Sequence, residues 1–300
     1  MTYHPRMASD ESDLITSREN RWLKRFRAAL RGTGPAESEP IGVEGPKLVE
    51  DALRSGLEAE ALLVSESAEP VLDTILRAAS ASEAGIARSR ILRTTDKLFA
   101  NAAGTETPQG IAALFRAPKW EFEDILRGAA DENGARLGAS PLVVVMAGVQ
   151  DPGNVGTIVR SAEAFGATGV VAARGTADPW SPKALRASAV SALRLPLLRG
   201  IALPVLLAQL KMAQVKIIAA SGRGLNSSPA ETRASRAYPD LRDPSAIFVG
   251  NEGAGLAPEV LHSADGAISI PMHQSVDSLN AGVAASIALF EAARQRSLVE

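Results

Sequence analysis

The segment that most constrains this chain is residues 145–171, VMAGVQDPGNVGTIVRSAEAFGATGVV. An apolar run ends at the polar loop QDPGN, and a helical pattern begins at Val155. At about 100° per residue, the apolar side chains of this helix share one stripe and Arg160 lies nearly opposite it. Ligands of open α/β sheets bind at the carboxyl ends of strands. The segment therefore predicts a strand, a loop and a helix that present Asn154 and Arg160 at a site.

The length of 300 residues predicts two domains, each large enough to bury its own core. We expect a disordered tail (1–14), a smaller N-terminal α/β domain (15–116), a linker (117–140) and a larger C-terminal α/β domain (141–300). Apolar residues make up 46% and charged residues 22% of the chain, which is typical of a globular protein.

Strand and helix signals alternate through both domains. The first should contain helices at 18–30, 46–54, 71–79 and near Lys97, and strands at 41–43, 61–64, 90–93 and 110–115. A short helix is expected at 121–126. The second should contain strands at 141–149, 169–173, 215–220, 245–250 and 267–270, a helix that begins at Val155, and helices at 182–193, 204–211, 258–263 and 279–296. The last helix should carry Leu279, Val283, Ile287 and Phe290 on one face. This alternation predicts a mostly parallel sheet covered on both sides.

The composition excludes several kinds of chemistry. The chain has no cysteine and only three histidines, so thiolate zinc sites and cysteine nucleophiles are ruled out. We expect no catalytic metal, although magnesium held by carboxylates stays open. No apolar stretch reaches the roughly 18 residues of a membrane span, and the N-terminus lacks the apolar region of a secretory signal. We therefore expect a cytoplasmic protein without a membrane segment.

The net charge is −2, but basic residues are concentrated in two segments. Residues 17–31 carry Arg18, Arg21, Lys24, Arg25, Arg27 and Arg31 against Glu19. Residues 181–200 carry Lys183, Arg186, Arg194 and Arg199 and no acid. Contact with a polyanion needs local patches of this kind. The alternative is that both are ordinary solvated helix faces.

Two further loops follow strands that the sequence predicts to be buried. Residues 246–256 place Glu252 among three glycines, where backbone can approach a ligand closely. In residues 268–280, Asp277 or Ser278 should cap the last helix, so that Asn280 lies in its first turn. Helix capping would also explain Asn154 and Ser278, and Glu252 could lie in an ordinary turn. Because all three loops follow strands, we expect them to lie around one crevice at the carboxyl edge of the sheet.

These residues resemble a known family. DPGNVGTIVRSAEAFGA, FVGNEGAGL and ISIPM…SLNAGVAASIALFEAARQ are similar to the three ordered motifs of the SpoU (TrmH-like) RNA ribose methyltransferases of the SPOUT superfamily. The first domain is similar to the N-terminal substrate-binding module of that family through ITSRENRWLKRF, EGPKLVEDAL and TPQGIAALF. Ala281 and Gly282 depart from the family's Val and Ser but remove no functional group.

The resemblance implies a parallel-sheet SPOUT domain with a trefoil knot, a homodimer, and methyl transfer from S-adenosylmethionine to a ribose 2′-hydroxyl in structured RNA. The catalytic candidates by motif position are Asn154, Arg160, Glu252, Ser278 and Asn280. The cofactor would lie against Gly250, Ile270, Met272 and Leu279. The RNA-binding candidates are Arg18, Arg21, Lys24, Arg25 and Arg27. Ribosomal RNA is the preferred substrate and transfer RNA the second choice.

Family accounts often give Arg160 the role of general base. A guanidinium with a pKa above about 12 rarely releases its proton. We therefore expect Arg160 to bind the phosphate beside the target ribose, oriented by Glu252 or Asn154. The alternative function is a non-catalytic RNA-binding or ribosome-binding protein that keeps the fold. Another nucleotide-dependent enzyme is disfavoured, since G-x-G-x-x-G and G-x-x-x-x-G-K-[ST] are both absent.

Overall fold

The computed structural model describes residues 14–33, 40–79, 90–128, 140–220, 239–273 and 278–297. The chain divides into two compact units, Met1–Ala117 and Pro118–Glu300, called unit 1 and unit 2 below. The predicted N-terminal tail lies outside the described residues except for Leu14, which begins the first strand. None of the helices in the described ranges combines the length and apolar character that crossing a bilayer requires.

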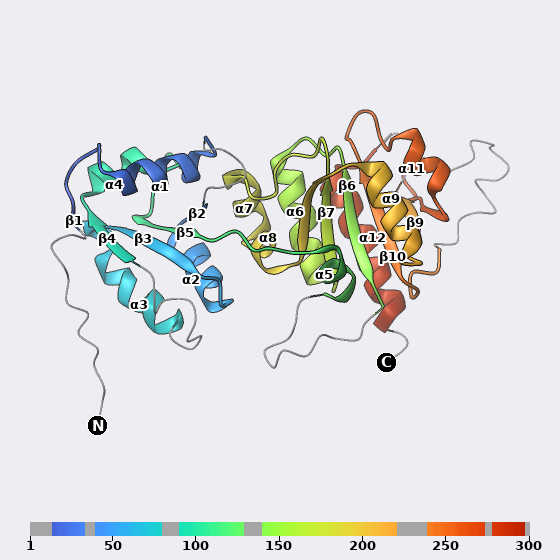
Figure 1. Ribbon diagram of the computed structural model, residues 1–300, viewed down its shortest axis with the longest axis horizontal. Helices are drawn as coiled ribbons and strands as arrows, with labels where there is room; N and C mark the ends of the chain where they lie inside the picture. Colours follow the sequence, from blue (N-terminus) through green and yellow to red (C-terminus); the bar gives the residue numbers. More distant parts are fainter. Residues whose placement is uncertain are drawn as a thin grey trace, which may run out of the picture. The chain divides into compact units, whose positions relative to one another are not determined.

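Unit 1 is built on a five-stranded mixed sheet in the order β1-β4-β3-β5-β2 (Figure 1). Its strands are β1 (Leu14–Ile15), β2 (Ile41–Glu44), β3 (Ala59–Ser65), β4 (Arg90–Thr94) and β5 (Ile111–Phe115). Its helices are α1 (Arg21–Arg31), α2 (Pro46–Arg54), α3 (Glu69–Ala79) and α4 (Asp96–Ala102), with a short 3-10 turn, η2 (Glu66–Ala68). Helices α1 and α4 cover one face, and α2 and α3 cover the other. This confirms the predicted α/β architecture.

Unit 2 contains a six-stranded, all-parallel sheet in the order β11-β9-β10-β6-β7-β8. Its strands are β6 (Leu142–Ala147), β7 (Gly169–Ala173), β8 (Leu197–Ile201), β9 (Lys216–Ala220), β10 (Ser245–Gly250) and β11 (Gly266–Ile268). The central strands β6 and β10 pair along their whole length, from Leu142 with Ser245 to Ala147 with Gly250. The loops that follow these two strands therefore begin at the same level of the sheet.

Helices cover both faces of the unit 2 sheet. They are α5 (Phe122–Arg127), α6 (Pro152–Ala164), α7 (Pro182–Ser188), α8 (Ser191–Arg194), α9 (Leu203–Met212), α11 (Pro258–Ser263) and α12 (Ala281–Ser297). One core cluster joins α5, α9 and α11 to the sheet through Ile125, Leu206 and Val260. Because Ile125 is completely buried there, α5 is part of unit 2, although the sequence analysis places it in a linker.

The helix predicted at 182–193 is two helices, and strand β8 after it is not predicted. Ala189 and Val190 adopt left-handed φ values of 47° and 63°. These two residues end α7 and redirect the chain into α8. A left-handed conformation is unfavourable for alanine and more so for a β-branched residue, so the sequence pattern does not reveal this break.

The last helix does not bury the face that carries its large apolar side chains. Helix α12 buries the small residues Ala281, Ala285, Ala288 and Ala292 together with Leu289, whereas Val283 and Phe290 are 46% and 55% exposed. Small side chains are buried because α12 approaches α6 closely. The Ser286 and Ser161 hydroxyls hydrogen-bond across this contact at 2.7 Å. A Cβ atom on Gly282 would lie 3.0 Å from Thr157.

Helix α12 spans the depth of the sheet. It starts beside the carboxyl ends of the strands, and near its other end the partly buried guanidinium of Arg296 reaches their amino ends. Arg296 donates hydrogen bonds to the carbonyl groups of Pro141, Leu241 and Asp243 at 2.9, 2.8 and 3.2 Å. These bonds fix the position of α12 relative to β6 and β10.

Helix α6 is held equally closely by α7. A Cβ atom on Gly156 would lie 2.4 Å from the Ala184 carbonyl oxygen and 2.6 Å from the Ala187 side chain. Such distances are not tolerated without displacement of one helix. Glycine is therefore required at this contact, and the contact fixes the helix that carries Asn154.

Replacing Gly156 with alanine should lower the free energy of unfolding by about 1–3 kcal/mol through overpacking, although alanine gains about 1 kcal/mol in helix propensity. Urea unfolding measures this. Gly153→Ala is the matched control, since its Cβ would be 3.3 Å from the nearest atom, on the Asp151 side chain. An unchanged or raised stability for Gly156→Ala would contradict the close contact.

Candidate active site

The loops after β6 and β10 are joined by Asn251, a residue that the sequence analysis does not single out. Its side-chain oxygen accepts hydrogen bonds from the backbone N–H groups of Gly253 and Ala254, each at 2.9 Å. Its side-chain amide donates to the Gly148 carbonyl at 3.0 Å. Asn251 thus closes the glycine-rich turn and ties it to the neighbouring loop. The sequence signal that could have identified Asn251 is its position as a polar residue directly after a buried strand.

A chain of three polar side chains crosses this junction. Asn280 donates to the Asn154 side-chain oxygen at 2.8 Å, and Asn154 donates to a Glu252 carboxylate oxygen at 2.9 Å. Asn154 is only 9% exposed. The structure therefore brings together one candidate from each of the three predicted loops. We call Asn280, Asn154 and Glu252 the amide chain.

Asn280 also caps α12, which corrects the predicted cap. Its side-chain oxygen accepts from the backbone N–H groups of Gly282 and Val283 at 2.9 and 3.3 Å. The helix begins at Ala281, so neither Ser278 nor Asp277 is its N-cap; Asp277 itself lies outside the described residues. Because the oxygen of Asn280 is committed to the helix, its amide N–H is directed to Asn154.

Glu252 is held as a carboxylate. Burial alone would raise its pKa, but hydrogen bonds from Asn154 and from backbone N–H groups, including that of Gln150 at 3.3 Å, hold the pKa of this carboxyl below its ordinary value. The site therefore presents a fixed negative charge at neutral pH.

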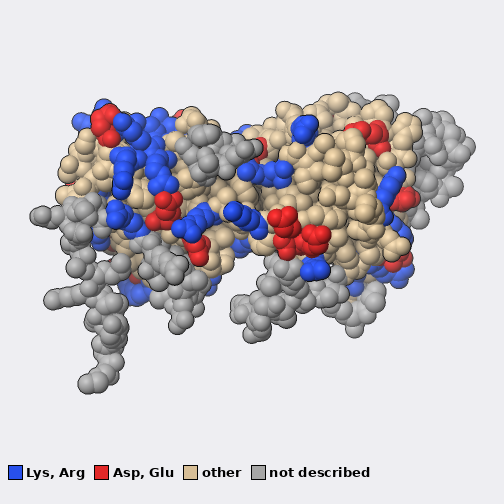
Figure 2. Space-filling model, in the orientation of Figure 1, with Lys and Arg blue, Asp and Glu red and all other residues tan. Residues whose placement is uncertain are grey.

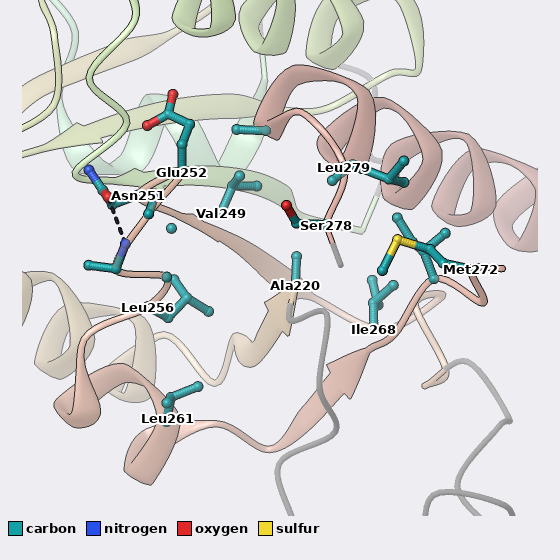
Figure 3. A pocket seen from close by; sticks show the side chains of 17 residues that line it. Ala220, Val249, Asn251, Glu252, Leu256, Leu261, Ile268, Met272, Ser278 and Leu279 are labelled. Atoms are coloured by element: carbon teal, nitrogen blue, oxygen red, sulfur yellow. Dashed lines mark hydrogen bonds between the residues drawn. The ribbon is translucent and has the colours of Figure 1, made fainter. Parts of the chain in front are cut away.

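A pocket of about 470 Å³ opens beside the amide chain, on the β9, β10 and β11 side of the sheet. The four predicted cofactor residues, Gly250, Ile270, Met272 and Leu279, all line it, as do Ser278 and Glu252. Figure 3 shows its mainly apolar wall, including Val249, Leu256 and Ile268, with the Ser278 side chain pointing into it. A Cβ on Gly250 would lie 2.4 Å from the Gly255 backbone, so glycine is needed for this turn. The volume and the apolar lining fit a nucleoside-sized ligand.

Arg160 is the one catalytic candidate that the structure does not bring to this point. It follows Asn154 by six residues on α6, which turns it about 240° around the helix and moves it roughly 9 Å along. Its side chain is exposed and forms no hydrogen bond or ion pair with the described residues. The predicted orientation of Arg160 by Glu252 or Asn154 is therefore not present within this chain.

The basic residues in and just before α1 are partly engaged in hydrogen bonds and ion pairs within unit 1. Arg25 makes two hydrogen bonds of 2.7 Å to Glu60, and Arg27 donates to the Asn101 carbonyl at 3.3 Å. Lys24 pairs with Glu19 at 2.5 Å. Arg21 lies 5.8 Å from the Trp22 ring, and Arg18 is exposed without a hydrogen bond or ion pair to the described residues. Figure 2 shows Lys and Arg side chains gathered on this face of unit 1, with acidic side chains among them.

The second basic segment is largely neutralised. Lys183 pairs with Asp151 at 2.7 Å, and Arg194 pairs with Glu163 at 2.6 Å. Arg199 pairs with Asp178 at 3.0 Å and lies 3.9 Å from the centre of the Trp180 ring. Of the four cations, Arg186 alone has no ion pair or hydrogen bond from its side chain to the residues that the structure describes. The sequence of residues 181–200 alone overstates the free positive charge of this segment, because the acids that pair with its cations lie in other segments.

The fold and site together define an α/β protein with a pocket of nucleoside size beside the Glu252 carboxylate. Comparison with known proteins identifies the family. Residues 141–290 match the SpoU rRNA Methylase family, and residues 36–113 match the MRM3-like substrate binding domain. The chain belongs to the SpoU rRNA methylase family.

Individual relatives agree with this assignment. The chain is 31% identical to the 23S rRNA (guanosine(2553)-2′-O)-methyltransferase RlmP of Bacillus subtilis, over 92% of this chain and 97% of that protein. The SpoU methyltransferase AviRb of Streptomyces viridochromogenes, solved with AdoMet, has a TM-score of 0.74 and 25% identity, and the match covers 93% of this chain and 98% of that one. An AdoMet-bound rRNA methyltransferase of Sinorhizobium meliloti has a TM-score of 0.72 and 26% identity, covering 94% and 97%.

These findings confirm the predicted family, the fold class, the methyltransferase activity on RNA and the cofactor S-adenosylmethionine. The trefoil knot stays a prediction. The pocket suits the cofactor, since its apolar side chains accept an adenine ring and its glycine-rich turn exposes backbone groups.

Two substitutions of Asn280 separate capping from its contact with Asn154. Asn280→Asp keeps an oxygen for the cap but has no proton to donate, so the hydrogen bond to Asn154 is lost. Asn280→Ala loses both functions. We expect the alanine variant to be about 1 kcal/mol less stable than the aspartate variant and methyl transfer to fall about tenfold or more in both. Thermal unfolding and single-turnover assays measure this; full activity of Asn280→Asp would contradict the role of the amide chain.

Proposed function

We propose that this protein transfers a methyl group from S-adenosylmethionine to the ribose 2′-hydroxyl of a nucleotide in 23S ribosomal RNA. The observation that carries the proposal is the amide chain, which holds an ionised Glu252 at the mouth of the pocket. The Bacillus subtilis relative is named for this reaction on this RNA and aligns along almost its whole length. Transfer RNA is the second candidate substrate.

The residues supply alignment rather than covalent chemistry. When bound, S-adenosylmethionine supplies an electrophilic methyl group. Glu252 accepts a hydrogen bond from the ribose hydroxyl at Oε2, the oxygen that also accepts the Gln150 N–H, and so orients the hydroxyl. The Ser278 hydroxyl lies in the same pocket and offers a second polar contact. This chemistry needs no metal ion.

Arg160 binds the phosphate beside the target ribose and lowers the pKa of the 2′-hydroxyl by its positive charge, so that the hydroxyl releases its proton to water as it takes up the methyl group. Its exposure and its distance from Asn154 along α6 support a site completed by a second copy of the chain. On unit 1, Arg18 and Arg21 are the main RNA contacts, with Lys24, Arg25 and Arg27 contributing charge around them. Because the substrate is ribosomal RNA, we place the protein in the cytoplasm.

The reaction is tested with 23S ribosomal RNA purified from cells that lack the gene. We expect one new 2′-O-methyl position after incubation with the protein and S-adenosylmethionine, and heat from calorimetric titration of the cofactor. Glu252→Gln keeps the side-chain shape but removes the charge, so cofactor binding should persist while kcat falls about 100-fold. Absence of cofactor binding in the unmodified protein would instead favour a non-catalytic RNA-binding protein.

The proposed homodimer forms through α12 and the adjoining part of α6. Val283 and Phe290 are large apolar side chains exposed on a helix that is otherwise closely packed. Phe165 at the end of α6 stacks edge-on against Phe290 at 5.9 Å, which extends the apolar surface. Exposed apolar patches of this kind mark protein contacts, and burial of this one would bring Arg160 to the interface.

Changing Val283 and Phe290 together to aspartate should produce a monomer, because two charges would have to be buried at the interface. Light scattering coupled to gel filtration measures the mass, and methyl transfer should fall with dimer content. Val205→Asp is the matched control, since Val205 on α9 is 54% exposed and lies outside the proposed interface. A monomeric unmodified protein with full activity would contradict the proposal.

A further inference from the structure

The carboxyl edge of the unit 2 sheet is divided between two halves. The pocket is lined by residues from β9, β10, β11 and the segments that follow them, which form one half of the strand order. The amide chain lies at the boundary, where β10 meets β6. The other half, at the ends of β7 and β8, contributes no residue to the pocket. A target ribose at the amide chain would leave the rest of its RNA strand over this second half.

Arg174 lies at the carboxyl end of β7, in this second half. The following residues are fastened to the loop after β6. The Ala177 N–H donates to the Val149 carbonyl at 2.9 Å, and the Gly148 N–H donates to the Thr176 hydroxyl at 3.0 Å. The Gln150 side chain donates to the Gly175 carbonyl, while the Gln150 backbone N–H donates to Glu252. Gly175, the residue after Arg174, is therefore hydrogen-bonded to Gln150 in the loop after β6. This bond anchors the backbone next to Arg174 to the site.

The charge of Arg174 is uncompensated. Its side chain is exposed and has no ion pair or hydrogen bond with the described residues. The nearby acids are already bonded: Asp178 to Arg199, Asp151 to Lys183, and Glu252 to Asn154. Within the described ranges 148–151, 174–181, 251–257, 269–273 and 278–280, which follow β6, β7, β10 and β11, Arg174 is the single Lys or Arg.

We propose that Arg174 is a substrate-positioning residue that binds a backbone phosphate of the RNA next to the target nucleotide. This inference rests on the proposed function. Neighbouring strands are about 4.8 Å apart, so β7, two positions from β10, lies roughly 10 Å from it. That separation suits a phosphate one or two nucleotides from a ribose held at the amide chain. A guanidinium matches the geometry of a phosphate through paired N–H donors.

The position also distinguishes Arg174 from a cofactor contact. A carboxylate of a ligand in the pocket would meet residues of β9, β10 and β11 first. Arg174 is separated from the pocket by β6 and its loop. Its removal should therefore weaken RNA binding and leave cofactor binding unchanged.

The test compares Arg174→Ala, Arg174→Lys and the matched control Lys211→Ala with the unmodified protein. Lys211 is exposed on α9 and has no side-chain ion pair within the described residues, so its variant loses the same charge elsewhere. The probe is 23S ribosomal RNA from cells lacking the gene. We measure KM and kcat for methyl transfer, the salt dependence of RNA binding, and S-adenosylmethionine affinity.

Arg174→Ala should raise KM for the RNA roughly tenfold, with kcat within twofold, and should reduce the slope of log binding constant against log salt by about 0.7–0.9. Arg174→Lys should restore the slope and most of the KM, and Lys211→Ala should match the unmodified protein. The proposal is overturned if Arg174→Ala behaves like Lys211→Ala, if it weakens cofactor binding instead, or if lysine restores nothing. Failure of the unmodified protein to methylate any RNA would instead reject the proposed function.

Discussion

The site depends on the direction in which three polar side chains share their hydrogen bonds. Each asparagine amide has one oxygen and one NH₂ group, and in the amide chain each end has a defined partner. The helix α12 N–H groups fix the oxygen of Asn280, Asn280 fixes the oxygen of Asn154, and Asn154 then donates to Glu252. An unpaired buried amide costs about 1–3 kcal/mol. The arrangement has a single favourable orientation, and it ends on the Glu252 carboxylate.

Close helix packing keeps the ends of this chain in place. Helix α6, which carries Asn154, contacts α7 through Gly156 and α12 through Thr157 and Ser161. Small residues on all three helices bring backbones together, so α6 has little freedom to shift. The residues that give α12 this close contact displace its large apolar side chains to the outside. The same packing therefore explains the precision of the site and the exposed surface available to a second copy.

Much of the fold follows from the sequence, because buried strands and amphipathic helices leave strong patterns. The bounds of β7, β10, α2 and α11 agree with those expected. The break at Ala189 and Val190 could not be foreseen, since neither residue favours a left-handed conformation. The buried face of α12 is not the one with its large apolar side chains, since close approach to α6 selects alanine and glycine.

The candidate site could likewise be predicted from the sequence only in part. Motif positions led to Asn154, Glu252, Ser278 and Asn280, which the structure places at one edge of the sheet. The bonds of Asn251, and the pairing of Lys183 and Arg199 with acids from other segments, depend on tertiary contacts and leave no local pattern.

The division of the sheet edge has a consequence for how such an enzyme diversifies. One half of the strand order forms the pocket, and the other half carries loops that contribute nothing to it. Substitutions or insertions after β7 and β8 can therefore alter which nucleic acid is chosen while affinity for the methyl donor is preserved. New substrate preferences can thus arise through a few mutations, and none of the intermediate variants needs to lose cofactor binding.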